Sequence, residues 1–233
     1  VLDWLGGHGR TRVDFACYTP HYLLPGLDVT AYPQAARLLT SLGFRPVTRA
    51  TAMDRDLVGH TVPAPVRRSV ERLTAQGYRF GTPSDDELAE LVRLAETTFS
   101  ADWARTIRSC LTAGASPEQI VTVRAPAPPD GGAGPLVGWA MHGAHGDSPE
   151  RFGPFGVHPD HRGTGLGRAL LHLALDRMRA RGLHHAWFLW TGADTPAGRL
   201  YRSSGFTTTR VFEVMRRDGG PPDGTPPTLR HRS

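Results

Sequence analysis

A glycine-rich turn is the part of the chain whose residue types point most directly to chemistry. The stretch Arg162-Gly163-Thr164-Gly165-Leu166-Gly167-Arg168 follows an apolar run that ends near Val157 and precedes a long helical pattern. Alternate glycines let a ligand approach the backbone closely, and N–H groups at the start of a helix attract negative charge. We therefore predict that this turn binds a diphosphate, with Arg162 and Arg168 adding positive charge at its rim.

Other glycine-rich phosphate sites match this turn less well. It has neither the G-x-G-x-x-G spacing of a dinucleotide-binding fold nor the Gly-Lys-Ser/Thr of a nucleotide P-loop, and no acidic residue ends the following strand to hold a ribose. A plain strand-to-helix turn is the remaining alternative, but such a turn rarely needs glycine at positions 163, 165 and 167.

Two motifs together resemble the GNAT superfamily of N-acetyltransferases. The Arg-x-x-Gly-x-Gly pattern after a Val-x-Pro strand end resembles its motif A, and residues 197–206 (AGRLYRSSGF) resemble its A-x-x-L-Y-x-x-x-G-F signature. The resemblance covers residues 78–217 and implies acetyl-CoA as co-substrate. The implied cofactor-binding residues are Phe155, Val157, Arg162, Gly163, Thr164, Gly165, Leu166, Gly167, Arg168 and Asp194.

The same resemblance implies how the reaction is catalysed. A bulged strand around Phe155–Val157, splayed from its neighbour, would offer free backbone groups to the pantetheine arm, and the N–H of Val157 would bond the thioester carbonyl. Tyr201 would be the general acid, because a phenol is well matched to a thiol leaving group; its alternative role is packing on a short helix. Asp194 stands where the family often has an Asn, and an anion beside the cofactor is less favourable.

The general base is left open by the sequence. Glu150, His142 and His145 are candidates, and water is another. The pairs His142 with His145 and His158 with His161 could be read as metal ligands, but no third ligand is apparent, so exposed loop histidines are the simpler interpretation and we predict no metal.

The segment between the first two helices of the resemblance is where this superfamily sets much of its substrate specificity. Here Phe99 and Trp103 could wall a site, and Asp102 could attract a cationic amine. The alternative is that both aromatic residues pack in the core.

The elements that must position these residues follow an α/β (α+β) pattern. Ser84 can cap a helix with acidic residues in its first turn. The implied GNAT fold has a central mixed, mostly antiparallel sheet, splayed at its fourth strand and flanked by helices. Periodicity predicts strands at 78–82, 119–124, 136–143, 153–158, 185–191 and 207–216, and further helices at 102–112, 166–181 and 196–203.

An internal repeat divides the chain. Aligning Gly43-Phe44 with Gly205-Phe206 makes residues 1–59 a partial GNAT-like copy, with Leu39 at the place of Tyr201 and no glycine-rich turn, so this copy is predicted to be inactive. Either this half-domain packs on the full copy or the chain lacks an upstream piece. We predict a linker at 60–77, the catalytic domain at 78–217 and a disordered tail at 218–233. First-copy positions that match the second are Leu2, Asp3, Gly9, Phe15, Ala35, Arg37, Leu38, Ser41, Met53, Arg55 and Asp56.

Composition limits the other function classes. No apolar run is long enough to cross a bilayer and the N-terminus is not a signal peptide, so we expect a cytoplasmic protein without a membrane partner. The net charge is +5 and all 27 basic residues are Arg, but they are spread along the chain, so we predict no nucleic-acid partner. Cys17 and Cys110 lie far apart without metal-like spacing.

These observations predict an acetyl-CoA-dependent N-acetyltransferase. It would move an acetyl group to a primary amine of a small molecule or peptide by direct attack in a ternary complex; assembly as a homodimer stays open. The alternative from another class is a non-catalytic acetyl-CoA-binding regulatory module. Retention of Tyr201 in one copy and its replacement by Leu39 in the other favours the enzyme.

Overall fold

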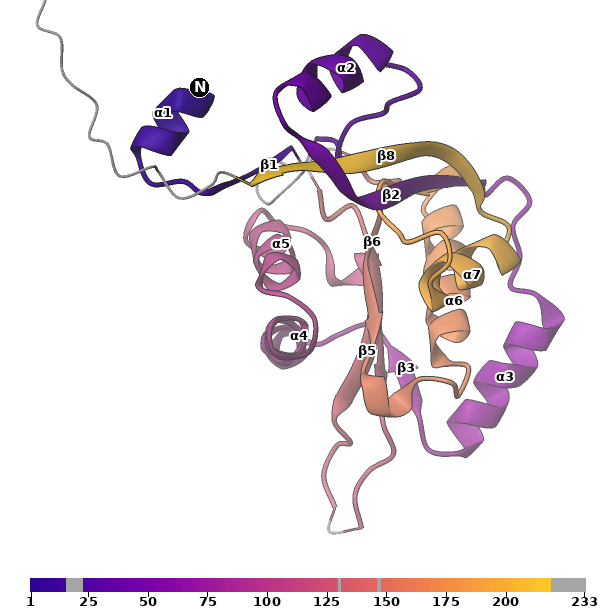
Figure 1. The fold of residues 1–233 in the computed structure, drawn as a ribbon. Coiled ribbons are helices and arrows are strands. Elements are labelled where there is room, and N and C mark those ends of the chain that lie inside the picture. The colour runs from indigo at the N-terminus through magenta and orange to yellow at the C-terminus, as the bar shows by residue number, and fades with distance from the viewer. Residues whose placement is uncertain (16–22, 130, 146–147, 219–233) are drawn as a thin grey trace, which may run out of the picture. The chain divides into compact units, whose positions relative to one another are not determined.

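The computed structural model describes residues 1–15, 23–129, 131–145 and 148–218 (Figure 1). Residues 219–233 of the predicted disordered tail, and Cys17, lie outside the described residues. The chain forms two compact units. Among the described residues, unit 1 consists of 1–15, 23–50 and 211–218, and unit 2 of 51–129, 131–145 and 148–210.

An antiparallel sheet of four strands is the centre of unit 2. Its order is β3 (Arg79–Gly81), β4 (Ile120–Arg124), β5 (Leu136–His142) and β6 (Phe152–Val157). Every residue of β5 is buried, which explains why its sequence is almost continuously apolar rather than alternating. The predicted mixed, mostly antiparallel sheet with flanking helices is confirmed.

Helices cover both faces of this sheet. The helices α4 (Asp85–Thr98) and α5 (Ala101–Thr112) lie on one side of β5 and β6, and α6 (Leu166–Ala180) lies on the other (Figure 1). Trp139 and Met141 pack toward α4 and α5, whereas Ala140 between them belongs to the core formed with α6, as expected for side chains that alternate along a strand. Val137 also belongs to the α6 core, because the register shift opposite Val123 and Arg124 breaks the alternation there.

Local sequence signals set the ends of several helices. Ser84 and Glu87 form the reciprocal capping box that starts α4. Thr195 caps α7 (Pro196–Ser203) by accepting a hydrogen bond from the N–H of Gly198. The strand β7 (His185–Phe188) lies between α6 and α7 and is shorter than predicted, and two single 3₁₀ turns, η1 (Pro117–Gln119) and η2 (Pro159–His161), complete unit 2.

The predicted linker at 60–77 is wrong over most of its length. Residues Ala64–Ala75 form the helix α3, whose Val66 and Leu73 are buried and which packs against α6. Pro63 precedes the helix and Pro65 lies in its first turn, where proline is tolerated because those N–H groups have no intrahelical acceptor. The prolines that suggested a linker are therefore the start signal of a helix.

Unit 1 contains α1 (Leu2–Gly7), β1 (Arg12–Phe15), α2 (Pro33–Ser41), the first half of β2 (Arg45–Asp56) and the second half of β8 (Thr207–Asp218). β1 pairs with β8 in antiparallel register. Leu27 exchanges two backbone hydrogen bonds of 2.8 Å with Glu213. Gly26 is required there, because a Cβ on it would lie 2.3 Å from the Glu213 carbonyl oxygen. Leu27, Phe44 and Met215 form a small core.

The observed elements follow the aligned repeat closely. The strands β2 and β8 begin and end at aligned positions, and α2 ends at the position aligned with the end of α7. The strand pairings match as well. Phe15 of β1 faces Met215 of β8, and their aligned residues, Phe188 of β7 and Met53 of β2, face each other in the same way. The boundary between the two units falls within β2 and β8.

Candidate active site

A cavity of about 650 Å³ in unit 2 is lined by the predicted phosphate turn and the predicted acid. Its wall is formed by all of β6, by residues 188–192 from the end of β7 onward, and by Pro196, Ala197, Leu200 and Tyr201 of α7. Arg162, Gly163 and Gly167 contribute the turn, and Phe99 and Trp103 contribute the segment between α4 and α5.

The two strands beside this cavity diverge. β6 and β7 are joined by a single parallel bridge between Arg151 and Trp187, where the N–H of Trp187 donates to the carbonyl of Glu150 at 3.1 Å. Past this bridge, β6 is paired only with β5 on its other side. The predicted splay at the fourth strand of the catalytic sheet is therefore present, and one backbone edge of β6 faces the cavity.

The register identifies which groups lie at that free edge. The N–H of His158 donates to the carbonyl of Val137 at 2.7 Å, and Gly156 faces Trp139. Because hydrogen-bonded residues alternate along an antiparallel strand, the N–H groups of Phe155 and Val157 point away from β5.

The predicted bulge around Phe155–Val157 is wrong in position. These residues pair regularly with β5, and the irregularity falls between Ala140 and His142, opposite Gly153 and Pro154. A proline has no N–H to donate to the ladder, so the disruption occurs at Pro154.

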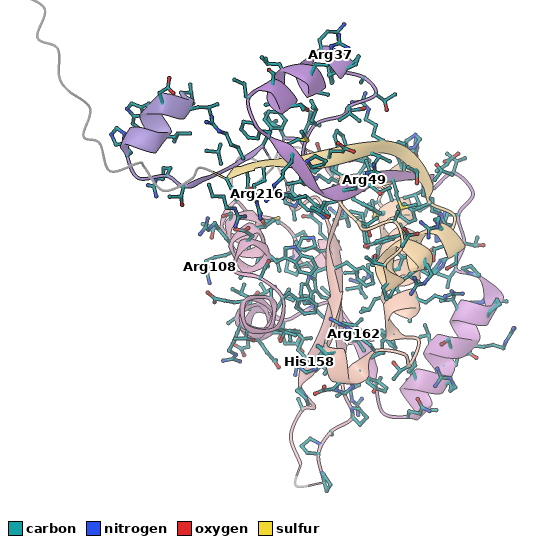
Figure 2. The ribbon with its side chains drawn as sticks, in the orientation of Figure 1. Arg37, Arg49, Arg108, His158, Arg162 and Arg216 are labelled. Atoms are coloured by element: carbon teal, nitrogen blue, oxygen red, sulfur yellow. The ribbon has the colours of Figure 1, made fainter. Side chains whose placement is uncertain are left out.

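The glycines of the turn serve two different needs. Gly163 and Gly165 have φ values of +79° and +102°, which L side chains rarely adopt. Gly167 has an ordinary φ, but a Cβ on it would lie 3.6 Å from Leu200 and 3.7 Å from Phe155, and so would fill part of the cavity wall. Arg162 fixes the turn to the strand, since its Nε donates to the carbonyl of Val157 at 3.0 Å (Figure 2 labels Arg162 and the nearby His158).

The turn fits a diphosphate through its backbone. The first N–H groups of α6, those of Leu166, Gly167 and Arg168, have no acceptor within the helix, and the helix N-terminus favours an anion. The side chains of Leu166 and Arg168 do not line the cavity. Leu166 is buried in the core, and the Arg168 guanidinium donates to Ser203 at 3.1 Å outside the cavity wall. The hydroxyl of Thr164 donates to the carbonyl of His161 at 2.8 Å.

Tyr201 lies among aromatic rings in the cavity wall. Its ring centroid is 4.4 Å from that of Phe188 and 6.1–6.2 Å from those of Phe155 and Phe152. Tyr201 is 8% exposed, and its hydroxyl has no hydrogen-bond partner among the described residues. Burial raises the pKa of Tyr201 well above the ordinary value, so the phenol keeps its proton at any physiological pH.

Two of the predicted carboxylates lie outside the cavity wall. Asp194 is exposed, and its contact is a backbone one, since its carbonyl accepts a hydrogen bond from Arg199 at 2.5 Å. Asp102 is also exposed, because the first turn of α5 presents it to solvent while Trp103 turns inward. Among the described residues, the cavity has Arg151, Arg162 and His145 in its wall but no carboxylate.

Of the candidate bases, only His145 lines the cavity. Burial and the neighbouring Arg151 lower the pKa of His145 to about 4. His142 is a buried residue of β5 whose Nδ1 lies 2.8 Å from the carbonyl of Pro149, so its interpretation as an exposed loop residue is wrong. Glu150 does not line the cavity.

Phe99 and Trp103 both line the cavity and pack in the core, the two roles that the sequence left open. Their rings stack at 5.3 Å, and both meet Trp139 of the core edge-on, yet both also line the cavity. Sequence reasoning missed Arg151, whose guanidinium lies 5.5 Å from the Trp187 ring centroid. The alternation of Trp187, Phe188 and Trp190 was the available signal for this wall, since Phe188 and Trp190 line it.

Comparisons with known proteins agree with this geometry. Residues 88–206 match the model of the acetyltransferase (GNAT) family. A mycothiol acetyltransferase of Thermobispora bispora is 42% identical over 91 residues, which are 36% of this chain but only 31% of that protein.

Two solved structures share the fold. One is described as a GCN5-related glucosamine N-acetyltransferase region of a fungal multi-domain GH3 β-N-acetylglucosaminidase; it has a TM-score of 0.74 and 17% identity, over 92% of this chain and 26% of that one. The other, a tandem GNAT protein from the clavulanic acid biosynthesis pathway, has a TM-score of 0.55 and 19% identity, over 95% of this chain and 68% of that one. The family match spans β4, β5 and β6, the glycine-rich turn and Tyr201, and the chain belongs to the acetyltransferase (GNAT) family.

Proposed function

We propose that unit 2 is an acetyl-CoA-dependent N-acetyltransferase that acts on a primary amine in a ternary complex. The observation that carries this proposal is a single cavity that joins three features: the glycine turn with its N–H groups, the free edge of β6 and the buried, protonated Tyr201. When bound, acetyl-CoA supplies an acetyl thioester, whose reaction with an amine gives an amide and a free thiol.

The protein's own groups divide the work along the cavity. The N–H groups from Gly163 to Arg168, with the Arg162 side chain, bind the diphosphate. The free N–H groups of Phe155 and Val157 are donors for carbonyl oxygens of the pantetheine arm and the thioester. Because the Tyr201 ring lies 6.1–6.2 Å from the rings of Phe155 and Phe152, we place the thioester nearer to Phe155 than the sequence suggested.

Tyr201 is the proton donor to the leaving sulfur in this proposal. Its support is a hydroxyl without a protein partner on a residue that lines the cavity, together with a raised pKa that keeps the phenol protonated. His145 is the candidate acceptor for the amine proton because, of the bases that the sequence offered, it is the one in the described cavity wall. Its lowered pKa keeps the imidazole neutral at physiological pH but also makes it a weak base.

The acceptor side is formed by Phe99, Trp103 and Trp190. Aromatic walls bind the apolar faces of a small molecule. The similarity to mycothiol acetyltransferases, whose name specifies a small-molecule acceptor, favours a small-molecule amine over a peptide.

We further infer that residues 1–59 derive from duplication of the second copy. The coincident element bounds and the exchanged pairings of β1 with β8 and β2 with β7 support this. Leu39 at the position of Tyr201 makes this copy inactive. A cytoplasmic location is proposed because the sequence has no apolar run long enough to cross a bilayer.

The test is titration calorimetry with acetyl-CoA, followed by a screen of amines that measures release of the free thiol. The proposal expects binding in the micromolar range typical of enzyme substrates, and turnover with at least one small-molecule amine. Binding without turnover across the panel would support a non-catalytic regulatory module, and absence of binding would end both interpretations.

A further inference from the structure

The helix α3 brings a cation to the outer side of the phosphate turn. Val66, Val70 and Leu73 fix α3 to the core, and one turn of its polar face then meets the turn at residues 164–165. Nη2 of Arg72 donates to the carbonyl of Thr164 at 2.8 Å. A Cβ on Gly165 would lie 3.0 Å from the Ser69 hydroxyl and 3.5 Å from the same Nη2.

This arginine has donors and charge to spare. A guanidinium carries five N–H donors, and the contacts of Arg72 with Thr164, Ser69 and Gln76 use three of them. Arg72 is exposed, and no carboxylate pairs with it among the residues that the structure describes. Its positive charge is therefore directed at solvent beside the turn rather than neutralised within the protein.

The charge pattern of coenzyme A gives this cation a partner. Besides the diphosphate, the molecule carries a phosphate monoester on the 3′ position of its ribose, one sugar away from the diphosphate. If the turn binds the diphosphate, the 3′-phosphate lies just outside the turn, within reach of the residues that flank it. Arginine binds phosphate through paired, charge-assisted hydrogen bonds.

We propose that Arg72, assisted by the Ser69 hydroxyl, forms a second phosphate subsite that binds the 3′-phosphate of coenzyme A. This inference rests on the proposed function, because it requires the diphosphate at the turn. The helix α3 lies outside the region that matches the family model, residues 88–206. The subsite gives this helix a role in selecting the phosphorylated co-substrate over its dephosphorylated form.

The experiment compares coenzyme A with dephospho-coenzyme A, which lacks only the 3′-phosphate. Titration calorimetry on the full chain gives the Kd of each ligand for the wild type, Arg72→Ala and Arg72→Lys. We expect the wild type to bind coenzyme A about tenfold more tightly, the effect of one charge-assisted contact at an exposed site. Arg72→Ala should lose that preference while its Kd for the dephosphorylated ligand changes less than about twofold.

Two matched variants test whether any loss of positive charge on α3, or of the cation on the α7 side of the turn, has the same effect. Arg67→Ala removes the same charge from α3, but Arg67 is held at the carbonyl of Val62, so the preference should persist. Arg168→Ala removes the cation on the α7 side of the turn, where Ser203 holds it, and the preference should again persist. Arg72→Lys keeps the charge and should keep part of the preference, which also covers the case in which the alanine variant does not fold.

Each other result overturns the subsite. Equal weakening of both ligands by Arg72→Ala would mean that Arg72 only holds the turn at Thr164. Loss of the preference in Arg168→Ala alone would place the 3′-phosphate on the α7 side. A wild type that binds both ligands equally would refute the subsite but leave the proposed function standing, whereas a wild type that binds neither would refute both.

Discussion

The guanidinium of Arg55 donates to the carbonyl of Ser204, the residue that ends the helix carrying Tyr201. Arg55 belongs to β2, the last strand of the proposed first copy, and its other Nη lies 2.9 Å from Nδ1 of His60. A Cβ on Gly205 would lie 3.6 Å from the same guanidinium. A strand of residues 1–59 thus holds the C-terminal end of the proposed catalytic helix.

Removing this contact should affect both stability and turnover. Arg55→Ala leaves the half-buried end of α7 without its donor, and we expect a loss of about 1–3 kcal/mol in the free energy of unfolding. Because Tyr201 lies one turn away, kcat should fall by roughly ten- to hundredfold. The aligned Arg217→Ala, whose side chain lies beside Gly43 in unit 1, is the control and should leave kcat within about twofold. Equal kcat in both variants would contradict a positioning role for Arg55.

Replacing Tyr201 by phenylalanine separates binding from chemistry. Tyr201→Phe keeps the aromatic packing against Phe188 and removes only the hydroxyl. We expect kcat to fall by about 10²–10⁴-fold, while the Kd for acetyl-CoA from calorimetry changes less than about twofold. Since burial raises the pKa of Tyr201, the wild-type rate should show no loss at pH 9–10 that the phenylalanine variant lacks. An unchanged kcat would leave Tyr201 a packing residue.

Filling the cavity wall at Gly167 should block the co-substrate without unfolding the protein. A Cβ at position 167 would lie 3.6–3.9 Å from side-chain atoms of Leu200, Phe155 and Val157. The two further methyl groups of Gly167→Val would therefore extend into the cavity. We expect at least a tenfold rise in the Kd for acetyl-CoA and a thermal midpoint within about 4 °C of the wild type. Undiminished affinity would show that the co-substrate does not pass this wall.

The buried pair His60 and His172 should make unfolding pH-dependent. Their rings stack at 5.8 Å, and burial, with Arg55 nearby, lowers the pKa of both, that of His172 to about 4. The folded state therefore binds these protons less readily than the unfolded chain, so stability is complete above the unfolded value near 6.5 and is lost as the pH falls toward 4.

The measurement is urea unfolding at pH 7 and pH 5. His172 alone should cost the wild type about 2 kcal/mol between these values, and His172→Gln should remove that part of the pH dependence. His8→Gln changes an exposed histidine of unit 1 and should leave the dependence as in the wild type. If His172→Gln keeps the full dependence, another group, such as His145, is responsible.

The acceptor wall can be tested with one residue inside the cavity and one outside. Trp190 is 43% exposed and lines the cavity, whereas Asp102 faces solvent. Trp190→Ala should raise the KM for the amine about tenfold with the Kd for acetyl-CoA unchanged, since it removes aromatic contact area. Asp102→Asn should leave the KM within about twofold. A large effect of Asp102→Asn would restore the role that the sequence suggested for this carboxylate.

Local chemistry let the sequence determine much of this protein. Glycines at 163 and 165 are needed for a left-handed backbone, Ser84 with Glu87 starts a helix, and Thr195 caps another, so these features can be read without the fold. The alignment of residues 1–59 with the second half of the chain could also be made without the fold, because it depends only on residue types, and the element bounds coincide with it.

Only the tertiary structure decided which side chains meet. The prolines before α3 looked like a linker because the partner of Leu73, the core beside α6, is distant in sequence. Strand pairing moved the irregularity of β6 to Pro154, and helix rotation turned Asp102 to solvent and Trp103 to the cavity. Register, helix rotation and burial depend on contacts between distant segments, and these contacts placed Arg72 beside the phosphate turn and Arg55 beneath the helix of Tyr201.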